Sequence, residues 1–156
     1  MKSRKKITVV GAGYVGMSLS VLLAQKNDVY VHDIDEERVQ TINSGKSTID
    51  DEYIDDYLKE LSTSIKATID KEEAYNDADF IIIATPTDFD EETHRFDTTS
   101  VESVIEDILL INSKCLIVIR STIPVGHTDF FREKYHNKKI IFSPEFSREG
   151  NALMDN

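Results

Sequence analysis

The sequence predicts an α/β fold built on a doubly wound, mostly parallel sheet. Short apolar segments alternate with helical patterns along the whole chain, as expected when helices cover both faces of a parallel sheet. A glycine-rich turn at 11–16 follows the first apolar segment and opens a helix. The 156 residues suffice for one domain, and no repeat or linker divides them. Together these observations indicate a single Rossmann-type domain over residues 1–156.

The first half of the chain is expected to supply three strands. The clearest are continuous apolar segments, which are typical of strands buried on both faces. Asp35 precedes a helical pattern, where its carboxylate can cap free N–H groups. In order, we expect strand 7–10, helix 14–25, strand 29–32, helix 36–42, an acidic, exposed helix at 51–61, a weaker strand at 65–69 and a short helix at 71–76.

The second half repeats this alternation with three more apolar strands. Thr99 and Glu102 are spaced as a capping box that opens a helix. In order, we expect strand 80–84, a polar loop at 85–98, the capped helix, strand 116–119, a turn at 121–126, a helix through Tyr135, strand 140–142 and a polar tail at 144–156.

The composition limits the classes of partner. The formal net charge is −11, which disfavours nucleic acid and anionic membrane surfaces. No apolar segment approaches the ~20 residues that cross a bilayer. The basic start resembles that of a signal peptide, but glycines interrupt the apolar stretch behind it and no cleavage site follows, so we expect a cytoplasmic protein. The single cysteine, Cys115, lies in an apolar segment and is interpreted as a buried structural residue. We predict no metal site.

The turn at 11–16 has the pattern G-x-G-x-x-G. Gly11 permits a tight turn, Gly13 leaves room for a pyrophosphate, and Gly16 lets the helix lie close to the strand. The N-terminus of the helix adds free N–H groups and a partial positive charge. A glycine-rich turn without a ligand is the structural alternative, but the flanking strand and helix favour a dinucleotide phosphate site.

Asp33 ends the second apolar segment, about 20 residues after the glycine turn. A carboxylate there can accept hydrogen bonds from both hydroxyls of the adenosine ribose and repels a 2′-phosphate, which favours NAD over NADP. Asp33 could instead open the next helix, but Asp35 already fills that position. Arg38 lies nearby and could accommodate a phosphate, so NADP stays open as the second choice.

Three further strand ends carry polar sequences. They are Ala-Thr-Pro-Thr at 84–87, Arg-Ser-Thr-Ile-Pro-Val-Gly at 120–126 and Ser-Pro-Glu-Phe-Ser-Arg-Glu-Gly at 143–150. Each alone is ordinary turn or cap chemistry. Because ligands of open α/β sheets bind outside the carboxyl ends of the strands, the three segments together predict one site.

With these motifs the chain resembles the N-terminal NAD-binding domain of the UDP-glucose 6-dehydrogenases, in the UDP-glucose/GDP-mannose dehydrogenase family. The resemblance includes GAGYVG, HDID, INSGKSTIDDEY, ATPT, STIPVG and SPEFSREGNALMDN, the last at 143–156. It implies an oxidoreductase of nucleotide-sugar metabolism that converts UDP-glucose to UDP-glucuronate, passing two hydrides to two NAD molecules. A cysteine of the family holds the sugar as a thiohemiacetal and then a thioester, and polysaccharide biosynthesis is the usual destination of the product.

The resemblance also implies roles for individual residues. Glu145 is expected to position or activate the water that cleaves the thioester, Thr122 to face the nicotinamide and the reacting carbon, and Glu149 to contact nicotinamide or sugar. The cofactor-binding residues implied are Gly11, Gly13, Tyr14, Val15, Gly16, Asp33, Arg38, Thr85, Pro86, Thr87, Ser121, Thr122 and Glu149. The sugar is expected to lie beside Glu145, Phe146, Ser147, Arg148 and Glu149.

The chain departs from the family chiefly in length. The catalytic cysteine, the connecting helix that carries the homodimer, and the UDP-binding half are absent from this sequence, so we expect a truncated domain that binds NAD and does not oxidise a sugar. The family usually has a leucine at the position of Ser147 and often a lysine at those of Arg38 and Arg120. These changes leave the NAD site intact.

Three alternatives remain open. A stand-alone NAD-binding regulatory module would not need Thr122, Glu145 and Glu149 at the nicotinamide end. A dehydrogenase for UDP-N-acetylmannosamine or GDP-mannose would share the NAD site, although the tail resembles the UDP-glucose enzymes more. A complete small dehydrogenase of another type would need a tyrosine–lysine or histidine constellation, and the four histidines belong to no such motif.

Overall fold

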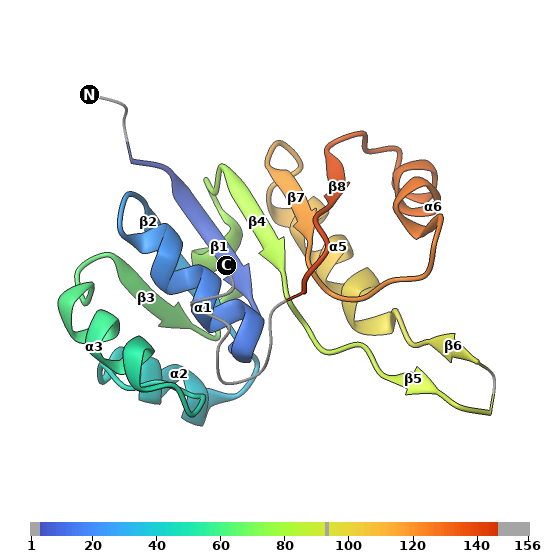
Figure 1. The fold of residues 1–156 in the computed structure, drawn as a ribbon. Coiled ribbons are helices and arrows are strands. Elements are labelled where there is room, and N and C mark those ends of the chain that lie inside the picture. The colour runs from blue at the N-terminus through green and yellow to red at the C-terminus, as the bar shows by residue number, and fades with distance from the viewer. Residues whose placement is uncertain (1–3, 93, 147–156) are drawn as a thin grey trace.

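The computed structural model describes residues 4–92 and 94–146. Its central sheet is parallel, with the strand order β3-β2-β1-β4-β7-β8 (Figure 1). The chain starts in the middle of the sheet, moves outward to β3, crosses back to β4 and moves out to β8. This is the doubly wound sheet that the sequence predicts. The strands are β1 (Lys6–Val10), β2 (Asp28–His32), β3 (Ile65–Thr68), β4 (Phe80–Ile83), β7 (Leu116–Ile119) and β8 (Ile140–Phe142).

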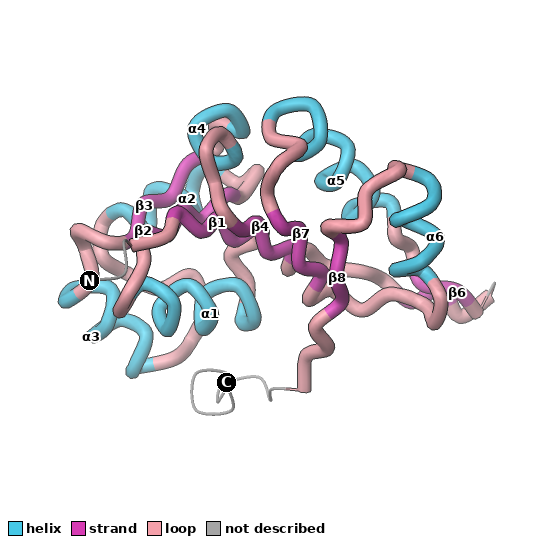
Figure 2. The backbone as a smooth tube through the Cα atoms, turned by 90° about the horizontal axis from the view of Figure 1, so that it is seen from above, coloured by secondary structure: helices cyan, strands magenta, loops and turns pink. Residues whose placement is uncertain are grey.

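Helices cover both faces of the sheet, as Figure 2 shows from above. Side chains alternate along each strand, so that in β1 Val9 packs into one core and Val10 into the other. The first core is closed by α1 (Tyr14–Ala24), α2 (Glu36–Asn43) and α3 (Glu52–Glu60), and the second by α4 (Lys71–Tyr75), α5 (Thr99–Ile111) and α6 (His127–Lys134). Cys115 is buried in the second core, where burial raises the pKa of its thiol to about 11. The structural interpretation of this cysteine is confirmed.

Three helices begin at an aspartate cap. The carboxylate of Asp35 accepts hydrogen bonds from the N–H groups of the second and third residues of α2, at 2.9 and 3.3 Å. Asp51 does the same for α3, and Asp70 for α4. These caps satisfy donors that have no partner within the helix. The predicted cap at Asp35 is therefore confirmed.

The predicted capping box of Thr99 and Glu102 was wrong. Helix α5 has its cap residue one position earlier, at Thr98, whose hydroxyl donates to the Glu102 carboxylate at 3.1 Å. Hydrogen bonds from Thr99, first from its side chain and then from its N–H at 2.9 Å, lower the pKa of the Asp97 carboxyl, so Thr99 is engaged with the residue before the cap.

The segment at 85–98 is more than a polar loop. It contains an antiparallel hairpin of β5 (Phe89–Asp90) and β6 (Arg95–Phe96), which extends away from the sheet (Figure 1). The rings of Phe89 and Phe96 face each other across the hairpin, with centroids 5.0 Å apart. None of the helices in the described ranges is long and apolar enough to cross a membrane.

The turn between β1 and α1 brings backbone very close to backbone. A Cβ atom on Gly16 would lie 1.8 Å from the carbonyl oxygen of Gly11. Gly11 has a φ of +104°, and a Cβ there would lie 2.5 Å from the Ala84 carbonyl oxygen at the end of β4. Both glycines are thus required by the fold itself, as the sequence predicts.

We expect Gly16→Ala to lower the free energy of unfolding by at least about 3 kcal/mol, because backbone, and not a flexible side chain, blocks the added methyl group. Urea unfolding followed by circular dichroism measures the change. Gly13→Ala is the matched control: a Cβ there meets nothing within 4 Å, so the free energy of unfolding should change by less than about 1 kcal/mol. Equal effects of the two variants would contradict this account of the turn.

Candidate functional site

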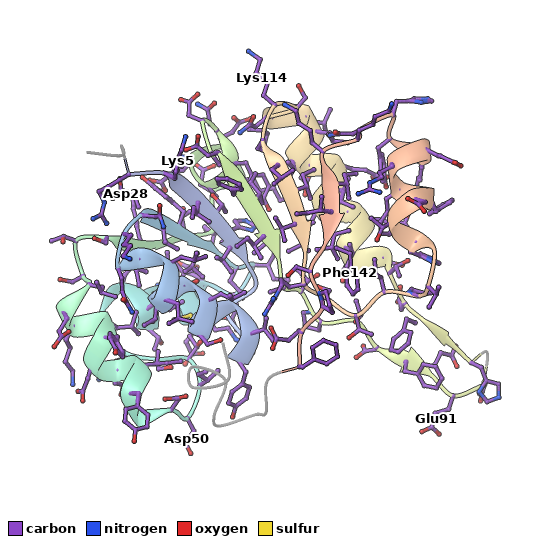
Figure 3. All side chains as sticks on the ribbon, turned by 45° about the horizontal axis from the view of Figure 1, so that its top comes forward. Lys5, Asp28, Asp50, Glu91, Lys114 and Phe142 are labelled. Atoms are coloured by element: carbon purple, nitrogen blue, oxygen red, sulfur yellow. The ribbon has the colours of Figure 1, made fainter. Side chains whose placement is uncertain are left out.

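The predicted site residues gather at the carboxyl edge of the sheet. Figure 3 shows this edge at the end marked by Phe142, while Lys5, Asp28 and Lys114 mark the opposite edge. Parallel strands all present their carboxyl ends on the same side, which is where open α/β sheets bind ligands. The glycine turn and the segments after β2, β4, β7 and β8 therefore meet there.

Two adjoining cavities at this edge contain the predicted site residues. One, of about 450 Å³, includes Gly11, Asp33 and Arg38 in its lining. The second, of about 370 Å³, is lined by Gly13, Tyr14, Val15, Thr87, Ser121, Thr122 and Glu145, among others. Thr85 and Pro86 line both cavities, so a ligand with two halves can lie across them. Gly16 lines neither and packs beneath the turn.

Asp33 is the acidic residue closest to the glycine turn in the first cavity. Its side chain is 10% exposed, and it accepts hydrogen bonds from the N–H of Ala12 at 2.8 Å and of Asp35 at 3.0 Å. Arg38 lies between two carboxylates, 3.9 Å from Asp33 and 3.7 Å from Asp35. A 2′-phosphate would face both carboxylates and compete with them for this arginine, so the arrangement disfavours NADP.

The N-terminus of α1 is open toward the second cavity. No side chain caps it and its first turn holds no acidic residue, in contrast to α2 and α4. Gly13 is the cap residue, with an ordinary φ of −87° and free space where a Cβ would stand. The protein's own packing does not require glycine here. An uncapped helix N-terminus behind such a gap fits the pyrophosphate of a dinucleotide.

Hydrogen bonds between strand ends form the wall between the two cavities. The Ser121 hydroxyl donates to the backbone carbonyl of Thr85 at 2.7 Å. The Thr85 hydroxyl lies 3.2 Å from that of Ser100, which in turn donates to the Pro86 carbonyl at 2.8 Å. Ser121 was predicted as a cofactor-binding residue, and its hydroxyl is engaged here in holding the segment after β4.

Sequence reasoning missed the partner of Glu145. Arg120, at the end of β7, forms an ion pair with the Glu145 carboxylate and donates to the Ser143 hydroxyl at 3.1 Å. The two charged side chains are only 15% and 14% exposed. This pair connects the ends of β7 and β8 and places Glu145 in the second cavity with Thr122. A basic residue directly before Ser-Thr-Ile-Pro was the only sequence signal.

The rest of the predicted sugar-binding segment is incompletely described. Phe146 is 88% exposed. Ser147, Arg148 and Glu149 lie outside the described residues, and their predicted roles stay predictions. Within the described ranges, no group of three or more histidine, cysteine, aspartate or glutamate side chains is placed to hold a metal ion.

A buried histidine also borders the first cavity. The Nδ1 atom of His32 lies 3.1 Å from the Tyr75 hydroxyl, and the two rings meet edge to face. Burial lowers the pKa of His32, and the nearby Lys71 adds to this effect. The Ile69 backbone carbonyl and the carboxylates of Asp33 and Asp107 act in the opposite direction without overcoming it. The ring is therefore neutral in the folded protein at neutral pH.

The sheet order, the open helix N-terminus and the carboxylate at the end of β2 together define a dinucleotide-binding domain of the Rossmann type. The family model described as "UDP-glucose/GDP-mannose dehydrogenase family, NAD binding domain" matches residues 5–156. The chain belongs to this family, and NAD is its cofactor.

Two relatives are similar over nearly the whole chain. The UDP-glucose 6-dehydrogenase of Streptococcus pneumoniae is 49% identical over 97% of this chain, and that of Campylobacter jejuni is 46% identical over 96%. The solved structure of UDP-D-ManNAc dehydrogenase from Pyrococcus horikoshii superposes with a TM-score of 0.87 at 26% identity, over 96% of this chain. The chain spans 38%, 39% and 38% of the lengths of these three proteins.

The buried histidine predicts a pH dependence of stability. The pKa of His32 is lower in the folded than in the unfolded state. Its contribution to the free energy of unfolding is therefore complete above about pH 6.5 and is lost as the pH falls below that value. The free energy of unfolding of wild type minus that of His32→Phe should fall by up to about 1.4 kcal/mol per pH unit in that range. Denaturant unfolding between neutral and mildly acidic pH measures this difference.

The matched control is His136→Gln, which removes an exposed histidine. This variant should lose stability in acid as the wild type does. A pH profile of His32→Phe that is parallel to that of the wild type would show that His32 titrates alike in both states.

Proposed function

We propose that this chain is the cofactor-binding part of a UDP-glucose 6-dehydrogenase, which oxidises UDP-glucose to UDP-glucuronate with two NAD molecules. The observation that carries the proposal is the second cavity, where Thr122 and Glu145 lie together with the phosphate-binding turn. A module that only binds NAD needs neither residue. The 49% and 46% identity to UDP-glucose 6-dehydrogenases favours this sugar.

The residues that line the two cavities have defined parts in this proposal. The N–H groups at the start of α1 hold the pyrophosphate, and Asp33 accepts the hydroxyls of the adenosine ribose. NAD supplies the hydride acceptor when it is bound. Thr122 orients a polar group at the nicotinamide end, and the Glu145 carboxylate, placed by Arg120, accepts a proton from the water that cleaves the thioester.

The chain spans 38% and 39% of the two UDP-glucose 6-dehydrogenases, and the remaining parts of the reaction are proposed to belong to segments beyond the matched part. We propose that 1–156 form one domain, that the nucleophilic cysteine and the UDP-binding half lie outside it, and that the chain alone binds NAD without oxidising sugar. The whole enzyme is proposed to be a cytoplasmic homodimer. The net charge of −11 supports the absence of nucleic-acid and membrane partners.

A second candidate substrate is UDP-N-acetylmannosamine. The fold of this chain is similar to that of the Pyrococcus horikoshii enzyme, which is named for this sugar. The NAD site alone does not distinguish between the two sugars. The higher identity to the two UDP-glucose enzymes favours UDP-glucose.

We expect the purified chain to bind NAD at least 10-fold more tightly than NADP in calorimetric titration. Asp33→Ala should weaken NAD binding by about 10-fold to 100-fold and reduce this preference, because it removes charged hydrogen bonds to the ribose and the repulsion of a 2′-phosphate. Asp28→Ala is the control: it removes a carboxylate at the opposite edge of the sheet that lines neither cavity, and NAD affinity should stay within about threefold. Equal affinity of the wild type for NAD and NADP would contradict the role of Asp33.

The isolated chain should form no NADH from NAD and UDP-glucose. A chimera with the part of the pneumococcal enzyme that follows the matched segment should form two NADH per UDP-glucose, measured by absorbance. Glu145→Gln should slow the chimera by about 100-fold or more, whereas Glu133→Gln, at an exposed site on α6, should not. A folded, NAD-binding chimera that oxidises no nucleotide sugar would overturn the proposal.

A further inference from the structure

The first cavity extends beyond what a ribose needs. One side is formed by Asp33, which follows β2, and by Arg38 in the first turn of α2. The other is formed by helices α4 and α5, which contribute Lys71 and Asp107 to the lining. Apolar side chains, among them Val104, complete the wall. A base attached to the ribose at Asp33 therefore enters a largely apolar space that also holds Ser100, Ser103 and one charged pair from α4 and α5.

The charged pair has a defined geometry. The Lys71 ammonium lies 2.6 Å from Oδ2 of Asp107, and the pair connects α4 to α5. The two side chains are 46% and 26% exposed, so the carboxylate is the more shielded of the two. Within residues 4–92 and 94–146, Oδ1 of Asp107 accepts no hydrogen bond. Lys71 thus holds the carboxylate in place while leaving one oxygen available as an acceptor.

We propose that Asp107 determines base specificity, by accepting a hydrogen bond from the 6-amino group of adenine at Oδ1. Lys71 is the positioning residue that fixes the carboxylate. The chemistry is selective because a carboxylate is an acceptor only: it binds an amino group and repels the carbonyl oxygen that replaces it in a 6-oxopurine. This inference rests on NAD binding in the first cavity.

The test compares NAD with nicotinamide hypoxanthine dinucleotide, whose base carries a 6-oxo group and a hydrogen on N1 in place of the 6-amino group and unprotonated N1 of adenine. Calorimetric titration of the chain should give about 10-fold weaker binding of the hypoxanthine analogue. Asp107→Asn should bring the two affinities within about twofold of each other, because the side-chain amide can both accept and donate. Glu106→Gln, on the same helix and outside the lining of the cavity, should keep the wild-type ratio.

The outcomes distinguish a failure of the role of Asp107 from a failure of the NAD assignment. NAD binding with no discrimination against the analogue, or discrimination that survives Asp107→Asn, would overturn the role of Asp107 and leave the cofactor assignment standing. If neither dinucleotide binds to the folded wild-type chain, the cofactor assignment fails and this inference fails with it. The wild-type comparison needs no variant, so equal binding of the two dinucleotides would overturn the role of Asp107 even if Asp107→Asn folded poorly.

Discussion

The contact between Gly16 and Gly11 is the constraint on which the rest of the structure depends. It sets α1 directly against the end of β1, closer than any side chain would permit. The same turn abuts the end of β4 through Gly11 and is held to the end of β2 by the bond from Ala12 to Asp33. The position of α1, its free N–H groups and the carboxylate at β2 are thus fixed relative to one another before any ligand arrives.

The other strand ends are joined by side chains instead of close backbone contacts. Ser121 ties the end of β7 to the segment after β4, and Arg120 ties it to the segment after β8. These bonds divide the edge of the sheet into two cavities with Thr85 and Pro86 between them. In the proposed complex the glycine turn receives the phosphates, while Ser121 and Arg120 at the end of β7 shape the cavities for the two halves of the dinucleotide.

Local patterns were sufficient for most of the fold. The six sheet strands follow from apolar segments, and the cap at Asp35 follows from its position before a helix. The hairpin was missed because its two short strands are stabilised by one aromatic pair, Phe89 and Phe96, with little local periodicity. The pairs Arg120–Glu145 and Lys71–Asp107 join residues distant in the chain, so only the packed structure brings them together. The first residue of α5 depends on which of several adjacent polar residues accepts the first free N–H group of the helix. The spacing of residues in the sequence does not determine this.

The missing cap of α1 has a consequence for the lifetime of the chain. Three neighbouring helices are capped by aspartates of the protein itself, whereas no side chain caps α1, and in the proposed complex the phosphates of NAD supply its acceptors. A ligand that binds only the folded state raises stability in proportion to the logarithm of its concentration above the dissociation constant. If NAD is held there as proposed, chains without it open more often and are cleaved first by proteases, so the supply of the dinucleotide would also govern how many copies of the domain persist.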